Sequence, residues 1–161
     1  MRTNSKFFYS IVLVACLSCS SGDGEKNRFE GYLGHVFNVP LGDGLYIIIP
    51  KDACKTCKEV VFNFLWHFEN TGDISLIFIG EVEEALYKNY LSRIEIMGVN
   101  VLKDFEQKIE EYGIIQTEFP IEYIRFIDID NGKLKIASNL TTQDFASDRS
   151  LVIYFGNHLK Q

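Results

Sequence analysis

Two cysteines, Cys54 and Cys57, are separated by two residues in the stretch PKDACKTCKEVV and are the side chains best suited to chemistry in this sequence. A pair with this spacing serves reversible thiol–disulfide exchange, half of a metal site, or a small structural disulfide. A structural zinc site needs four ligands, and the chain has neither a second CxxC pair nor a CxxC…HxxxH spacing. The histidines are scattered, so we expect no metal site: His35, His67 and His158.

The cysteine pair is predicted to open a helix that follows a buried strand. The run Leu45 to Ile49, LYIII, is continuously apolar, which is typical of a strand covered on both faces. Pro50 ends this strand, and Asp52 is a residue type that caps helix N-termini. Apolar residues then recur at helical spacing, up to a stop at Gly72, and predict one buried stripe: Cys57, Val60, Val61, Phe64, Leu65 and Phe68.

Strand and helix signals alternate through the rest of the chain. The alternating runs IEYIRFIDI and KLKIAS are joined by Asp130-Asn131-Gly132, which predicts a β-hairpin. The tail from 147 to 159 fits a helix or a strand. Strands that alternate with helices and finish in a hairpin predict an α/β fold with a central mixed sheet flanked by helices. The other predicted elements are strands at 35–39, 74–79 and 99–102, a helix at 81–94, and a short helix that starts at Asp104 and Gln107, as in a capping box, and reaches Tyr112.

The first nineteen residues have the pattern of an export signal. Arg2 and Lys6 precede an apolar run from Phe7 to Leu17, which is too short for a stable bilayer span. Within this run, Leu13-Val14-Ala15-Cys16 resembles the lipobox of bacterial lipoproteins. We therefore expect lipid on Cys16.

Cys19 is the alternative lipid site. Lipid there would leave Cys54 and Cys57 as the only thiols, whereas lipid on Cys16 leaves Cys19 without a partner. An ordinary cleaved signal without lipid also fits the pattern. An exported location matters for the CxxC pair, because such a pair can be held oxidised outside the cytoplasm.

The remainder of the chain is predicted to contain a short tether and one domain. Residues 20–28, SSGDGEKNR, are small and polar and indicate a flexible tether, and residues 29–161 indicate a single domain. The chain is 47% hydrophobic and 14% aromatic, enough for one core. Two of the sixteen basic residues and none of the twenty-two acidic ones lie in the signal, so the rest of the chain has a formal charge of −8. This charge argues against nucleic acid or an anionic membrane surface as partner.

This order of elements, with a CxxC motif that opens the helix after a buried strand, resembles the thioredoxin-like fold. The resemblance covers roughly Gly44 to Ser138. In that family a cis-proline begins the strand that leads into the closing hairpin and lies beside the CxxC motif, and Pro120 stands in this place. The stretch NVLKDFEQKIEEYGIIQTEFP is similar to the redoxin branch, where a strand that ends in Asp and a short helix that ends in Tyr-Gly precede the proline. Together with the lipobox, this resembles a redoxin-type bacterial lipoprotein.

Three features depart from the family pattern. The centre of the motif is Lys-Thr instead of Gly-Pro or X-Pro. The residues before it are Pro50-Lys51-Asp52-Ala53 instead of aromatic ones. Many members carry a buried acid beneath the motif as proton acceptor, but LYIII supplies no carboxylate, and Glu81 is the nearest acid after the next strand.

The predicted positions of the two thiols suit disulfide exchange. A thiolate, and not a thiol, attacks a disulfide, and the first turn of a helix directs free N–H groups and a positive dipole end at its first residues. Lysines around Cys54 add positive potential, and we expect its pKa to be lowered: Lys51, Lys55 and Lys58. Cys54 is therefore the predicted nucleophile. Cys57, on the inward stripe, is the predicted resolving thiol.

The resemblance implies a membrane-anchored thiol–disulfide oxidoreductase that acts on protein thiols and disulfides of the cell envelope. Phe119 and Pro120 would shape the substrate groove, where the backbone of Phe119 pairs with an extended client segment. Electrons would come from a redox partner protein, and no bound cofactor is expected. The residue directly after the lipid cysteine, Leu17 or Ser20, is not the Asp that retains many lipoproteins at the inner membrane, so we prefer the outer membrane.

Two other functions remain open. The protein could be a non-catalytic binding or assembly lipoprotein, in which the disulfide is structural and the groove holds a peptide or another envelope protein. A peroxidase is the third reading. It needs a Thr or Ser shortly before the attacking cysteine, and the residues before Cys54 supply neither.

Overall fold

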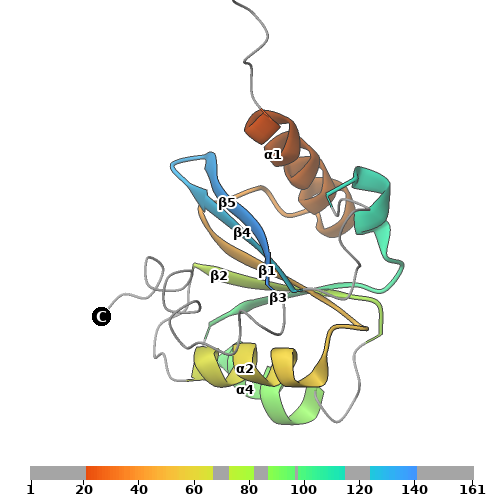
Figure 1. Cartoon of the computed structure of the whole chain (residues 1–161), viewed down its shortest axis with the longest axis vertical. Coiled ribbons are helices and arrows are strands. Elements are labelled where there is room, and N and C mark those ends of the chain that lie inside the picture. Colours follow the sequence, from red (N-terminus) through yellow and green to blue (C-terminus); the bar gives the residue numbers. More distant parts are fainter. Residues whose placement is uncertain (1–20, 67–72, 82–86, 97, 115–123, 141–161) are drawn as a thin grey trace, which may run out of the picture.

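The computed structural model describes residues 21–66, 73–81, 87–96, 98–114 and 124–140. Within them, five strands form one sheet in the order β3-β2-β1-β4-β5 (Figure 1). Neighbouring strands β1, β2 and β3 are parallel, whereas β4 runs antiparallel to both β1 and β5. The bounds of the strands are Gly44–Pro50 for β1, Ile74–Ile79 for β2, Asn100–Asp104 for β3, Ile124–Asp130 for β4 and Lys133–Leu140 for β5.

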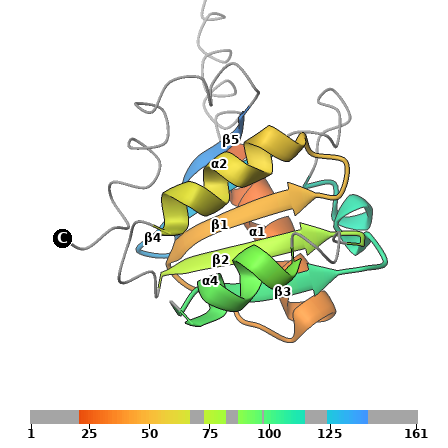
Figure 2. The same ribbon diagram turned by 90° about the horizontal axis from the view of Figure 1, so that it is seen from below.

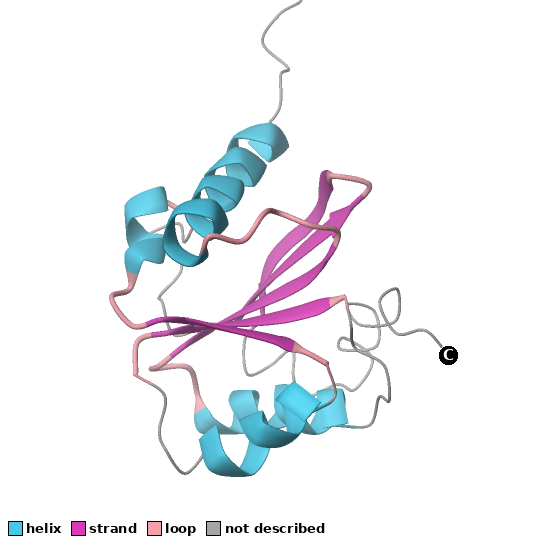
Figure 3. Cartoon of the chain, turned by 180° about the vertical axis from the view of Figure 1, so that it is seen from behind, coloured by secondary structure: helices cyan, strands magenta, loops and turns pink. Residues whose placement is uncertain are grey.

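Helices cover both faces of this sheet, and the predicted α/β architecture is confirmed. Helices α2 (Lys55–Trp66) and α4 (Ser92–Ile96) lie on one face, as Figure 1 and Figure 2 show. Helix α1 (Ser21–Tyr32), with the short turn η3 (Lys108–Tyr112), lies on the other face (Figure 3). Two hydrophobic cores result, one on each face. One is centred on Ile47, Val61, Leu65, Leu76 and Phe126, and the other on Phe29, Tyr32, Ile48, Ile77 and Ile127.

Strands β1 and β2 form the buried centre of the sheet. Every residue of β1 is buried, and five of the six residues of β2 are, so these runs are apolar without alternation. Strands β4 and β5 form the predicted hairpin. Its two-residue turn places Asn131 at φ 51° and Gly132 at φ 66°, the left-handed conformations that an Asn-Gly turn requires between antiparallel strands.

The first described segment is a helix and not the predicted flexible tether. Helix α1 includes residues 21–28 and continues to Tyr32, so the folded part begins before residue 29. Its local sequence, SGDG, has a low helix propensity. Tertiary contacts decide the outcome, because Phe29 and Tyr32 are fully buried and Glu25 forms an ion pair with Arg125 of β4.

Several predicted boundaries also change. The strand predicted at 35–39 is wrong: the π-helical turn η1 (Leu33–Phe37) extends α1, and Asn38 ends it with φ 55°. Of the helix predicted at 81–94, the described part comprises η2 (Tyr87–Leu91) and α4, and residues 82–86 lie outside the described residues. Strand 99–102 is confirmed as β3. Among the described residues, no helix has the length and apolar character needed to cross a bilayer.

Candidate functional site

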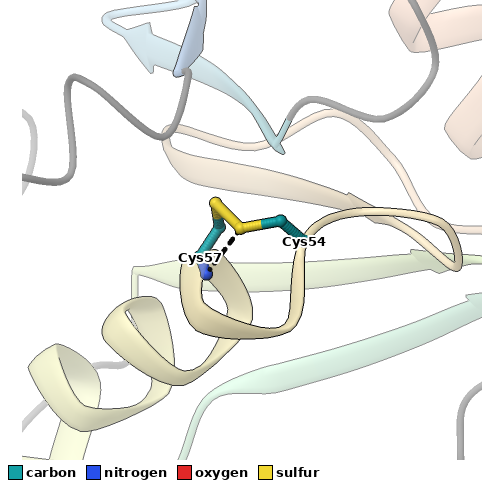
Figure 4. Close-up of a disulfide and its surroundings, with 2 residues drawn as sticks. All are labelled: Cys54 and Cys57. Atoms are coloured by element: carbon teal, nitrogen blue, oxygen red, sulfur yellow. Dashed lines mark hydrogen bonds between the residues drawn. A yellow bond between two sulfur atoms is a disulfide. The ribbon is translucent and has the colours of Figure 1, made fainter.

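Cys54 and Cys57 form a disulfide at the carboxyl end of β1, with their Cα atoms 5.3 Å apart (Figure 4). Cys57 is only 6% exposed and belongs to the core beneath α2. Cys54 is half-buried and packs against the edge of that core. The sequence predicted this arrangement of an outer and an inner sulfur. The structure therefore presents one accessible sulfur joined to one shielded sulfur.

Cys54, and not Asp52, occupies the N-cap position of α2. The helix begins at Lys55, and the Cys54 carbonyl accepts the first helical hydrogen bond from the Lys58 N–H at 3.1 Å. The Cys54 sulfur accepts a hydrogen bond from the Cys57 N–H at 3.1 Å (Figure 4). Asp52 lies in the preceding turn with an exposed side chain. The sulfur thus takes the place of the usual capping oxygen, and the same N–H would stabilise a thiolate.

The loop that carries Cys54 is fixed by backbone hydrogen bonds. The Lys51 N–H donates to the Ile79 carbonyl at 2.9 Å, which continues the β1–β2 ladder by one residue. The Ala53 N–H donates to the Pro50 carbonyl at 3.0 Å and closes a turn, and the Ala53 side chain is buried. These two hydrogen bonds set the path of the loop, which places Cys54 at the start of the helix.

Gly80, directly after β2, makes room for the loop. Its φ is +80°, and an added Cβ would lie 3.0 Å from the Cδ of Lys51. The aliphatic stem of Lys51 therefore packs over the backbone of Gly80. Glu81, the acid that the sequence places nearest to the CxxC motif after β2, directly follows Gly80, and its side chain is exposed.

The predicted groove residues Phe119 and Pro120 lie outside the described residues, as do the lipid sites Cys16 and Cys19. The register of β4 gives partial information about the groove. Arg125 of β4 lies opposite Ile48 of β1, two residues before Pro50. The start of β4 is thus at the end of β1 from which the cysteine loop departs.

A second capped helix start lies at the carboxyl end of β3. Asp104 is 2% exposed, and its carboxylate accepts hydrogen bonds at 3.0 Å from the N–H groups of Lys108 and Ile109, at the start of η3. It also accepts one at 3.0 Å from the hydroxyl of Tyr32 in α1. Burial, together with the negative charge of Asp104, raises the pKa of Tyr32 far above its ordinary value. The capping-box pattern pointed to Asp104, but no local signal pointed to Tyr32.

Among the residues that the structure describes, no group of three His, Cys, Asp or Glu side chains is placed to hold a metal ion. His35 is exposed, and its Nδ1 lies 2.9 Å from the hydroxyl of Tyr112, on the face of the sheet that carries α1. A shallow cavity of about 510 Å³ lies beside this pair. It is lined by both acidic and basic side chains, with Lys108 bridging Glu106 and Glu111.

No protein-family model matches the chain, and no curated protein matches it. A search of solved structures finds a peroxiredoxin-like protein from Aquifex aeolicus, 18% identical, with a TM-score of 0.40. The match spans 63% of this chain and 63% of that protein.

The strand order, the parallel and antiparallel neighbours, the closing hairpin and the cysteines at the start of α2 define a thioredoxin-like fold, as the sequence predicted. A disulfide within a CxxC motif at this place in the fold supports a function in redox chemistry.

Proposed function

We propose that this protein is a thiol–disulfide oxidoreductase of the cell envelope, with Cys54 as the nucleophile and Cys57 as the resolving thiol. One observation carries the proposal: a half-buried sulfur, which accepts a hydrogen bond from a helix N–H, is joined to a sulfur buried in the core. Exchange needs this asymmetry, because one sulfur must be accessible to the client disulfide, whereas the other must react only after the mixed disulfide has formed.

The reaction has two exchange steps. In the reduced protein, the Cys54 thiolate attacks one sulfur of a client disulfide, and the other client sulfur leaves as a thiolate. Cys57 then loses its proton to solvent or to the leaving thiolate and attacks the Cys54 sulfur. This step forms the Cys54–Cys57 disulfide and releases the second client sulfur. Two electrons pass to the client, and the oxidised protein has the disulfide seen in the structure.

A dithiol on a redox partner protein would restore the reduced form by the same two steps in reverse. Thiol chemistry alone balances the electrons, so the proposal includes no organic cofactor. Phe119 and Pro120 remain the proposed groove residues. The groove would hold an extended client segment beside Cys54.

The proposed location is the envelope, with lipid on Cys16 or Cys19 and a preference for the outer membrane. Helix α1 begins at Ser21, and this supports a domain held close to the bilayer. At most four residues would separate the lipid cysteine from the helix, and the five steps from Cys16 to Ser21 span no more than roughly 18 Å at about 3.6 Å per residue. Clients would then be proteins whose disulfides lie near the membrane surface.

A non-catalytic binding module is the second candidate. The Lys-Thr centre of the motif and the absence of a carboxylate in the LYIII run favour it. In that case the disulfide would stabilise the start of α2. The closed loop is so short that the loss of chain entropy would contribute only about 2 kcal/mol.

The reduction potential of the purified protein, measured by equilibration with glutathione, separates the two candidates. A value between about −120 and −270 mV is the range of exchange proteins, and one below about −300 mV is that of structural bridges. Cys54→Ser should abolish insulin reduction, whereas Cys57→Ser should accumulate a mixed disulfide with the client. Insulin reduction retained by the Cys54→Ser variant would contradict the assigned roles.

A further inference from the structure

A lysine in the second turn of α2 reaches back across the loop that carries the cysteines. The ammonium of Lys58 donates a hydrogen bond to the backbone carbonyl of Lys51 at 2.5 Å. The N–H of the same Lys58 donates to the carbonyl of Cys54. Lys58 is thus bonded to the cysteine loop at two places, three residues before Cys54 and at Cys54 itself.

Helix geometry places this side chain beside Cys54. Residues four apart lie on the same face of a helix, and side chains lean toward its N-terminus over the preceding turn. Lys58 is four residues after Cys54. Its side chain therefore passes over the turn that contains Cys54 before it reaches the carbonyl of Lys51.

The other two lysines of the motif have different surroundings. The stem of Lys51 packs over Gly80, and Lys55 is exposed on the first residue of α2. In the part of the chain that the structure describes, Lys58 is the one of these three lysines whose ammonium is hydrogen-bonded to the loop. Among the described residues, the acidic side chains next to the loop in sequence or at the end of β2 are Asp52, Glu59 and Glu81, and each is exposed or half-buried.

We propose that Lys58 is a positioning residue of the exchange site: it holds the cysteine loop in the oxidised protein and pairs with the Cys54 thiolate in the reduced protein. The inference rests on the proposed function, because a purely structural disulfide would have no working reduced form for Lys58 to stabilise.

The physical reason is a change of charge at Cys54. In the disulfide the sulfur is neutral, and a backbone carbonyl is the better acceptor for an ammonium. Reduction creates a full negative charge on Cys54, and an ammonium is attracted more strongly to a full negative charge than to the partial charge of a carbonyl oxygen. The flexible Lys58 side chain can then exchange one acceptor for the other without a movement of the backbone.

The test uses the purified protein and three variants: Lys58→Met, Lys58→Arg and Lys55→Met. The last is the matched control, because it removes the same charge from a nearby exposed position. Two quantities are measured: the pKa of the Cys54 thiol after chemical reduction, from the absorbance of the thiolate, and the equilibrium constant with glutathione.

We expect Lys58→Met to raise the pKa of Cys54 and to shift the glutathione equilibrium about tenfold toward the disulfide. This change corresponds to a potential about 30 mV more negative. Lys58→Arg should restore most of the wild-type pKa. Lys55→Met should shift the equilibrium by less than about threefold.

Equal pKa values for Cys54 in the Lys58→Met and Lys55→Met variants would overturn the inference. So would a Lys58→Met variant with lowered stability to urea but an unchanged pKa, since Lys58 would then only hold the loop. If Lys58→Met does not fold, Lys58→Gln is measured instead, with the same expected direction. A wild-type potential below about −300 mV contradicts the proposed function and the inference with it, whereas a potential in the exchange range with equal pKa values in the Lys58→Met and Lys55→Met variants overturns the inference alone.

Discussion

Two helical segments begin at the same edge of the sheet, and they satisfy their first N–H groups in different ways. Helix α2 follows β1, and the sulfur of Cys54 accepts a hydrogen bond from one of its N–H groups. The turn η3 follows β3, and the carboxylate of Asp104 accepts from two of its N–H groups. Asp104 is nearly inaccessible, whereas Cys54 is half-buried.

The two capping side chains therefore differ in role: Asp104 is a structural cap, and Cys54 is a cap suited to chemistry. Asp104 receives a third hydrogen bond from Tyr32, so both of its oxygens have donors and its position is fixed by two other segments. The Cys54 sulfur accepts one N–H and is bonded to Cys57 through a disulfide that exchange can open. A weaker cap on an accessible side chain leaves the sulfur available for exchange, while the buried carboxylate stabilises the edge of the sheet beside it.

The largest expected effect comes from removal of the structural cap. Asp104→Ala leaves the hydroxyl of Tyr32 and the N–H of Ile109 buried without an acceptor and the half-buried N–H of Lys108 without its partner, and should lower the free energy of unfolding by about 3 kcal/mol. Urea denaturation measures this change. Asp104→Asn is the control of similar shape and should lose less. A loss below about 1 kcal/mol for Asp104→Ala would show that this carboxylate is not the structural cap described here.

A smaller effect is expected for Tyr32→Phe, which removes one donor to Asp104. The free energy of unfolding should fall by about 1 kcal/mol near neutral pH. The pKa of Tyr32 is raised in the folded state, so the unfolded chain loses this proton first, and wild-type stability should decrease as the pH rises above about 10. Tyr32→Phe should show a shallower decrease. If the free energy of unfolding falls equally steeply with rising pH in both proteins, Tyr32 is not the group responsible for the decrease.

The smallest effect is expected at the cap of α2. Cys54→Ser and Cys54→Ala both lack the disulfide, but the serine hydroxyl can accept the hydrogen bond from Cys57 N–H. Serine should therefore be the more stable variant by about 1 kcal/mol or less, as determined by urea denaturation. Identical midpoints would mean that the side chain at position 54 contributes no cap. A variant Cys54→Asp, which copies the cap of η3, should be at least as stable as the serine variant.

Local patterns were enough to predict the elements that surround the disulfide. The apolar runs of β1 and β2, the Asn-Gly turn between β4 and β5, and the place of the cysteines at the start of α2 all follow from residue spacing within a short window. The capping residue of α2 was misplaced by two positions. Both Asp52 and Cys54 precede the helix, and only the turn closed by the Ala53 N–H shows which of them reaches the first N–H groups.

The sequence by itself determined the strands from β1 to β5, the helix that follows β1, and the positions of an outer and an inner cysteine, because hydrophobic periodicity and turn chemistry are local. Tertiary structure alone decided that residues 21–28 are helical and that Asp104 accepts a hydrogen bond from the hydroxyl of Tyr32. The partners in these contacts lie far apart in the chain: Tyr32 is 72 residues from Asp104, and Glu25 is 100 residues from Arg125. Such contacts form only when the sheet brings distant segments together, and no pattern within one segment specifies them.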